Sequence, residues 1–183
     1  MLVRIIPVGT VSEKLLKEVS GGIENTLGIK TRVMENLVVP KESYNALRRQ
    51  HDADKMIDLL CKNQVAQYID RDLPALFITD ADLYADKMNF AFAVEDPVYS
   101  VSIISMARLR TEFYGQGINL YLLGERVTKE AVHTLGHQLG LEHCFRPTCV
   151  MSPSPSAGDV DKKQKIMCRD CEVKASKVIS LPR

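Results

Sequence analysis

Seven of the nine histidine and cysteine side chains in this 183-residue chain fall between positions 133 and 171, about a fifth of its length. These side chains are the usual protein ligands of zinc. This region overlaps a C-terminal stretch, residues 141–183, that is rich in proline and poor in large apolar residues. Such a stretch cannot build a core by burial alone, and a metal crosslink would hold it in place. The cluster therefore constrains the fold of the C-terminal part more than any hydrophobic pattern does.

Composition excludes several other classes of protein. Lys+Arg 24 and Asp+Glu 23 leave a net charge of +1, which does not favour a polyanion-binding or membrane-surface protein. The length favours one domain, and we expect a monomer. No run approaches the ~18 apolar residues of a membrane span, and Arg4 and Pro7 break the only apolar stretch at the N-terminus. We expect a cytoplasmic protein, in which clustered cysteines bind metal more often than they form disulfides.

The hydrophobic pattern predicts an α/β fold, a twisted mixed sheet with flanking helices. Apolar runs predict strands at 2–8, 31–39, 74–79, 88–94 and 99–105, with residues 95–97 joining the last two. Helical spacing predicts helices at 11–26, from Asp52 or Asp54 to about Ile69, and from a start between Asn119 and Thr128 to Gly140. Between 99 and 105 apolar residues alternate with serines, which predicts one buried and one wetter face.

Three histidines form the first candidate site. His133 and His137 are four residues apart in a predicted helix, so both leave the same face, one turn apart. Gly140 permits the left-handed turn that can bring His143 back as a third ligand. Three imidazoles leave the fourth tetrahedral position of a zinc ion open, as in catalytic sites. A histidine pair at this spacing can also be an ordinary part of a core, but the glycine and the third histidine favour metal binding.

Four cysteines form the second candidate site. Cys144, Cys149, Cys168 and Cys171 make a C-x4-C and a C-x2-C pair, which is typical of a closed, structural zinc site. Two disulfides or unrelated free thiols are the alternatives. The fifth cysteine, Cys61, lies in a predicted helix and is interpreted as a buried small hydrophobe.

The histidine string resembles the long zinc signature of the metzincin metalloproteases, H-E-x-x-H-x-x-G-x-x-H. The residues from Cys144 through Cys149-Val-Met151 to Cys168-Arg-Asp-Cys171 resemble the continuation of that signature in the archaemetzincins, C-x4-C-x-M followed by C-x-x-C. More loosely, residues 79–84 and 105–109 are similar to the same family. The resemblance implies that Met151 forms an apolar turn beneath the histidine zinc without binding it.

Position 134 departs from this signature, because Thr134 stands where the family has glutamate. In these enzymes that glutamate takes a proton from the zinc-bound water and passes it to the leaving amine. A threonine hydroxyl offers only hydrogen bonding near neutral pH. Glu130, one turn before His133, and Glu142, beside His143, are the nearby carboxylates, and neither is placed against the zinc by the sequence.

The resemblance implies a single metzincin-like domain over residues 1–183, in which 1–143 carry the zinc helix and 144–183 form a small zinc-clamped subdomain. It implies two zinc ions, a cleft between the two parts, and a peptide or protein substrate that docks on a strand edge near 88–105. The predicted function is a zinc metallopeptidase weakened by Thr134. The alternatives are an inactive zinc-containing peptide-binding protein and a purely structural zinc protein.

Two weaker features are interpreted without a site. Residues 161–165 are a short charge run without interleaved aromatic residues, so no nucleic-acid partner is predicted. Asp80 and Asp82 follow a predicted strand, where turn formation is the favoured interpretation over participation in a site.

Overall fold

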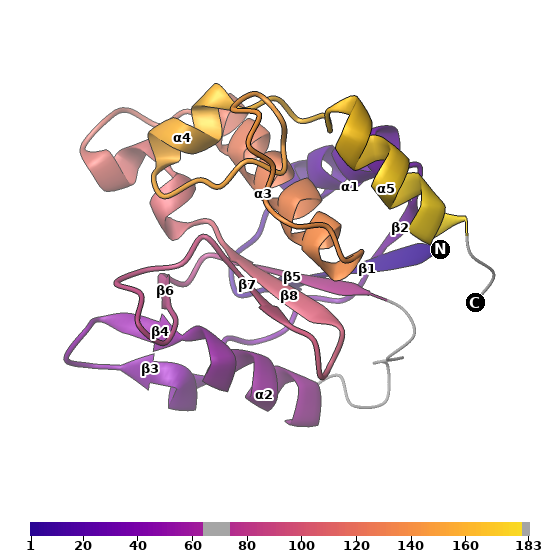
Figure 1. Cartoon of the computed structure of the whole chain (residues 1–183). Helices are drawn as coiled ribbons and strands as arrows, with labels where there is room; N and C mark the ends of the chain where they lie inside the picture. The colour runs from indigo at the N-terminus through magenta and orange to yellow at the C-terminus, as the bar shows by residue number, and fades with distance from the viewer. Residues whose placement is uncertain (64–73, 181–183) are drawn as a thin grey trace.

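A mixed five-stranded sheet lies at the centre of the molecule in the computed structural model, which describes residues 1–63 and 74–180 (Figure 1). In spatial order its strands are β2 (Lys30–Val33), β1 (Leu2–Val8), β5 (Ala75–Thr79), β8 (Val101–Ser105) and β7 (Ala93–Asp96). The first four are parallel to one another, whereas β7 pairs with β8 in the antiparallel direction. β7 is therefore an edge strand that runs against the rest of the sheet.

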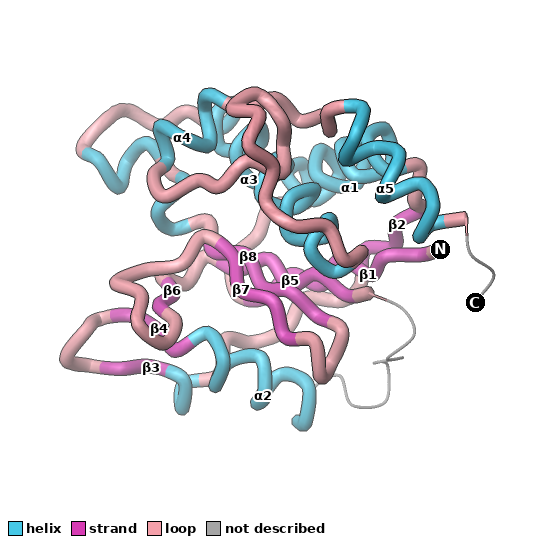
Figure 2. Tube along the Cα trace, in the orientation of Figure 1, coloured by secondary structure: helices cyan, strands magenta, loops and turns pink. Residues whose placement is uncertain are grey.

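Helices cover both faces of this sheet (Figures 1 and 2). On one face lie α1 (Glu13–Leu27) and α3 (Leu120–Gln138), with the C-terminal α4 (Ala157–Lys162) and α5 (Arg169–Ile179) on the same side. The other face carries α2 (Ala53–Asn63) beside a small sheet of β3 (Tyr44–Asn45), β4 (Gln50–Asp52) and β6 (Leu83–Tyr84). Single 3-10 turns span Lys41–Ser43, Ala107–Leu109 and Thr111–Tyr114. The predicted α/β fold with flanking helices is confirmed.

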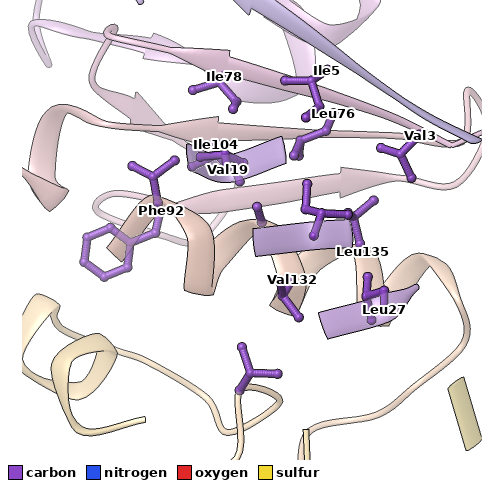
Figure 3. Packing of buried hydrophobic residues seen from close by; sticks show 14 of the residues in the cluster. Val3, Ile5, Val19, Leu27, Leu76, Ile78, Phe92, Ile104, Val132 and Leu135 are labelled. Carbon is purple, nitrogen blue, oxygen red and sulfur yellow. The ribbon is translucent and has the colours of Figure 1, made fainter. Parts of the chain in front are cut away.

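Strand periodicity builds the two cores on either side of the sheet. Along β1, Val3 and Ile5 pack toward α1 and α3, whereas Ile6 and Val8 pack toward α2, because successive side chains point to opposite faces. Figure 3 shows Val3 and Ile5 on the sheet, in the same cluster as Leu135 of α3. Since both faces are covered, the central strands are apolar on both sides.

This double coverage corrects the prediction of a wet face on strand 99–105. All five residues of β8 are buried, and its serines are satisfied inside the protein. Ser102 contacts the side-chain amide of Gln138, and the Ser105 hydroxyl donates to the Ala81 carbonyl at 2.6 Å. The serines alternate with apolar residues because they meet polar partners from α3 and a loop, and not because they meet water.

Several predicted boundaries also move. The strand predicted at 88–94 is wrong for most of its length, because the carbonyls of Met88 and Asn89 accept hydrogen bonds from Arg48 and the strand begins at Ala93. The strand predicted at 31–39 ends at Val33, and Leu37 forms only an isolated bridge to Val8. Strand 2–8 is confirmed. The predicted end of the second helix, near Ile69, lies outside the described residues.

The C-terminal segment shares the main core. Val150, Met151, Val160 and Met167 are buried in the same hydrophobic cluster as the residues of α1 and α3. The segment does not form a core of its own, as its composition predicts, and its apolar residues pack onto α3 and the main core instead. Within the described parts of the chain, no helix is both long enough and apolar enough to cross a membrane.

Candidate metal centre and active-site cleft

The histidines are positioned by α3, whose two ends are both defined by the local sequence. Asn119 is the N-cap, and its side-chain oxygen accepts the Leu122 N–H at 2.9 Å. At the other end Gly140 adopts φ +81°. The Gly140 N–H donates to the His137 carbonyl at 2.8 Å and the Leu141 N–H to the Gly136 carbonyl at 3.0 Å. This pair of bonds is a Schellman motif, which reverses the chain just after the second histidine.

The reversed chain orients two of the three imidazoles through backbone carbonyls. His137 Nδ1 lies 2.8 Å from the Leu141 carbonyl oxygen, and His133 Nδ1 lies 2.9 Å from that of Val150. A carbonyl oxygen only accepts, so each Nδ1 carries the hydrogen, and in a neutral ring each Nε2 is then an unprotonated donor of a lone pair. Contacts of this kind are the usual outer-shell supports of metal-binding histidines.

The three rings converge on one point. His133 Nε2 and His137 Nε2 are 3.1 Å apart, and the His143 ring lies with its centroid 5.3 and 4.8 Å from those of His133 and His137. Two lone pairs facing each other repel unless a cation lies between them. Nitrogens that share one tetrahedral zinc at 2.0–2.1 Å are about 3.3 Å apart. His133, His137 and His143 therefore fit a zinc ion and leave its fourth position for another ligand.

Burial lowers the pKa of two of these imidazoles, those of His133 and His143. Burial, followed by the positive charge of Lys163, lowers the pKa of His133 to about 3. Burial also lowers the pKa of His143, with the His137 charge acting in the same direction and Glu95 acting against it. A neutral imidazole is the form that binds a metal ion, so no proton has to be displaced from His133 at neutral pH.

Met151 lies against the part of α3 that carries the two helical histidines. It is fully buried, and a Cβ on Gly136, between the two helical histidines, would collide with its sulfur. Gly136 therefore allows the Met151 turn to approach α3 closely. Because Val150 is the residue that orients His133, the same turn supplies both an apolar floor and a hydrogen-bond acceptor.

Thr134, which follows His133 on α3, is fully buried, and its hydroxyl forms a hydrogen bond. Thr134 Oγ1 donates to Glu95 Oε1 of the edge strand β7 at 2.5 Å. No sequence pattern indicates this contact, because the hydrophobic pattern predicts residue 95 in the connection between two strands. A tertiary contact across 39 positions thus brings a carboxylate to the residue that replaces the family's glutamate.

Glu130, the nearby carboxylate on α3, is engaged elsewhere. Glu130 Oε1 lies 2.9 Å from Lys163 Nζ, and the two side chains are 5% and 1% exposed. Burial raises the pKa of Glu130, and the Lys163 charge opposes that shift. Lys163 Nζ also donates to the Ser152 carbonyl at 3.3 Å. Glu130 therefore ties α3 to the C-terminal segment.

The four clustered cysteines converge on a second point. Their sulfur atoms all lie within 4.8 Å of one another, and the Cys144 and Cys168 sulfurs are 3.7 Å apart. Thiolates that share a tetrahedral zinc at 2.3 Å are about 3.8 Å apart, whereas disulfide sulfurs are about 2 Å apart. The thiols are free, and the Cys171 N–H lowers the pKa of Cys168 to about 7. These four cysteines therefore fit a closed zinc site.

A cleft of about 1150 Å³ opens above the histidines. It is lined by the three histidines, by Glu95 of the edge strand and by the loop Pro153–Pro155 that follows the Met151 turn. The cleft thus lies between the sheet edge and the C-terminal segment, where the resemblance placed it.

The remaining candidates lie away from this cleft. Asp82 forms a bidentate ion pair with Arg108, at 2.8 and 2.9 Å, which stabilises a loop. Asp82 is not among the residues that line the cleft. Glu142 is exposed and also lies outside the cleft lining. Cys61, a residue of α2, is buried in the hydrophobic cluster between this helix and the sheet. Burial raises the pKa of its thiol to about 12, which makes the thiol unreactive.

Comparisons with known proteins agree with this geometry. The model of peptidase family M54 matches residues 9–177. An archaemetzincin from Pyrococcus furiosus is 36% identical over 178 residues, covering 93% of this chain and 90% of the relative. An archaemetzincin from Sulfolobus acidocaldarius is 38% identical over 149 residues, 81% of each chain.

Two solved structures have the same fold. A zinc-dependent peptidase from Methanocorpusculum labreanum superposes with a TM-score of 0.86 at 27% identity, covering 94% of this chain and 99% of that one. The archaemetzincin from Archaeoglobus fulgidus, solved with malonate, superposes with a TM-score of 0.77 at 30% identity, covering 95% and 99%. The match therefore extends over nearly the whole of both chains.

Proposed function

The chain belongs to peptidase family M54, the archaemetzincins, and on this premise we propose that it hydrolyses peptide bonds at a zinc ion held by His133, His137 and His143. The observation that carries the proposal is the approach of the His133 and His137 Nε2 atoms to 3.1 Å, with each Nδ1 atom at hydrogen-bond distance from a backbone carbonyl oxygen. A bound zinc ion polarises a substrate carbonyl and lowers the pKa of water in its open position.

We assign a second zinc ion to Cys144, Cys149, Cys168 and Cys171. Four thiolates close the coordination sphere, so this ion has an architectural role. In this assignment residues 144–183 are a zinc-clamped subdomain within one domain, supported by the convergence of the four sulfurs and by the shared hydrophobic cluster. Since Cys144 follows His143 directly, the two sites are mechanically connected.

The chain's own residues suit an extended peptide substrate. The antiparallel edge strand β7 borders the cleft, and a peptide can add to such an edge through main-chain hydrogen bonds, which would carry its scissile bond across the histidines. We propose a peptide or protein substrate bound in this way by a monomer, without a nucleic-acid or membrane partner.

A second candidate function rests on Thr134. General acid–base assistance accelerates a reaction by a factor of about 10²–10⁴. At the position where the family has its glutamate, this chain has the hydroxyl of Thr134. The alternative is a protein that keeps the zinc and the peptide cleft but has lost hydrolysis. A purely structural zinc protein is the third class, and a water ligand in the spectrum of a cobalt-substituted sample would exclude it.

Peptide cleavage by the zinc-loaded chain decides between the first two candidates. A peptidase should cleave a quenched-fluorescence peptide library, and its His133→Ala variant should not. If the wild type binds zinc but cleaves nothing, while Thr134→Glu cleaves, the natural protein is the peptide-binding alternative on a peptidase scaffold.

A further inference from the structure

We propose that Glu95 of β7 is the general base of this chain and that Thr134 is its positioning residue. The carboxylate that family members carry on the zinc helix would here come from the sheet edge opposite it. This inference rests on the proposed peptidase function and deepens it, because it names the residue that replaces the missing glutamate.

The strand periodicity aims Glu95 at the cleft. On β7, Val94 packs into the hydrophobic cluster on the α2 side of the sheet, whereas Ala93 packs into the cluster that contains α3. Because strand side chains alternate, Glu95 shares the α3 face with Ala93. Its cross-strand partner is Ser102, which contacts Gln138, the neighbour of His137. Both strands thus present polar side chains to the histidine turn of α3.

The hydrogen bond to Thr134 places the Glu95 carboxylate about as far from α3 as the carboxylate of a glutamate at position 134 would be. Thr134 Oγ1 lies on the Cβ of residue 134, and Glu95 Oε1 lies 2.5 Å beyond it. One C–O bond plus this hydrogen bond spans roughly the distance from Cβ to the carboxylate oxygen of a glutamate side chain. The hydroxyl donates and the carboxylate oxygen accepts, so Thr134 holds Glu95 by Oε1, and Oε2 does not take part in this bond.

The other described carboxylates in the cleft lining are committed to other partners. Asp96 accepts the backbone N–H groups of Val98 and Tyr99 at 2.8 and 3.1 Å, which fixes the turn after β7. Glu130 is paired with Lys163 and almost fully buried. Glu95 is the cleft carboxylate that is exposed to solvent and contacts the helix between the two histidines.

The proposed proton transfers balance for hydrolysis. As the oxygen of water bonds to the peptide carbonyl carbon, Glu95 takes one proton of that water, and the C=O π pair moves onto the carbonyl oxygen. When that pair returns, the C–N bond breaks, its electrons stay on nitrogen, and Glu95 delivers the proton there. The products are a carboxylic acid and an amine, and Glu95 is regenerated as a carboxylate.

The test compares variants of the full zinc-loaded chain. Glu95→Gln keeps the size and the acceptor for Thr134 but removes the base, so kcat should fall by about 10²–10⁴ while zinc content is unchanged. Thr134→Val should also lose rate, whereas Thr134→Ser, which keeps the hydroxyl, should not. Adding Thr134→Glu to Glu95→Gln should restore cleavage by returning the carboxylate to the helix.

Affinity for a peptide hydroxamate gives a readout that does not depend on turnover. The hydroxamate N–OH donates to a nearby carboxylate base, so Glu95→Gln should bind it about tenfold more weakly or worse. Glu142→Gln, which removes an equal charge beside His143 but outside the cleft lining, is the matched control and should behave as wild type.

The outcomes separate this inference from the proposed function. A zinc-loaded Glu95→Gln variant with wild-type kcat and hydroxamate affinity overturns the role of Glu95 and leaves the peptidase intact. A zinc-loaded wild type without activity, rescued by Thr134→Glu, overturns it as well. A wild-type chain that binds no zinc overturns both proposals.

Discussion

Lys163 Nζ lies 2.9 Å from Glu130 Oε1 in the interior, with the two side chains only 1% and 5% exposed. The pair joins α3, one turn before His133, to the segment that follows α4. The same ammonium donates to the Ser152 carbonyl, one residue past Met151. A buried ion pair thus connects the zinc helix to the turn that supports it.

Removing one partner of this pair should be costly. Lys163→Met leaves an uncompensated buried carboxylate, so we expect the free energy of unfolding to fall by about 3–5 kcal/mol. Replacing both residues, as Glu130→Leu with Lys163→Met, should recover most of that loss. Urea unfolding measures both effects. Lys162→Met, which breaks only the exposed pair with Asp159, should cost less than about 1 kcal/mol. Equal losses in the two lysine variants would contradict the role given to Lys163.

Zinc stoichiometry should follow the two clusters. We expect two zinc ions per chain by elemental analysis and one in His133→Ala, because two imidazoles do not retain the ion against a chelator. His51→Ala is the matched control, since His51 contacts Ser43 and lies far from the cluster in the sequence, and it should keep both ions. A well-folded wild type free of zinc would contradict both assignments.

Loss of the cysteine site should weaken the histidine site. Cys168→Ser should release the structural ion and lower the zinc affinity of the histidine site by about 10–100-fold, the usual effect of a lost outer-shell support. The physical link is the Cys144 N–H, which donates to the Met151 carbonyl at 2.9 Å next to His143. Chelator competition measures this affinity. Cys61→Ala, outside the cluster, should leave it unchanged.

A methyl group at Gly136 should disturb the floor of the site. Gly136→Ala drives a Cβ into the Met151 sulfur, so we expect overpacking to cost about 1–3 kcal/mol and weaken zinc binding. Gly21→Ala in α1 has nothing within 4 Å of the new Cβ and should instead stabilise by about 0.5–1 kcal/mol. Thermal unfolding of both variants, together with zinc titration, checks the contrast.

Local patterns were sufficient for much of the fold. The apolar run at 2–8 predicted β1. The helix predicted to start between Asn119 and Thr128 and to end at Gly140 is α3, and the structure selects Asn119 as its N-cap. These predictions succeed because caps and periodicity act over a few residues. The strand predicted at 88–94 was misplaced because Arg48, far away in the sequence, binds its carbonyls. The alternation at 99–105 was misread because serines that meet buried polar partners have the same pattern as serines that meet water.

The sequence by itself determined which side chains could bind metal, because His133, His137 and Gly140 act through helix geometry and the cysteine pairs through short spacing. It also identified Thr134 as the departure from the family. Only the tertiary structure decided what surrounds that residue. Glu95 reaches Thr134 because β7 is the sheet edge facing α3, and Lys163 reaches Glu130 because the C-terminal segment packs back onto the helix. Contacts between distant segments depend on how the chain closes, and neither periodicity nor spacing encodes them.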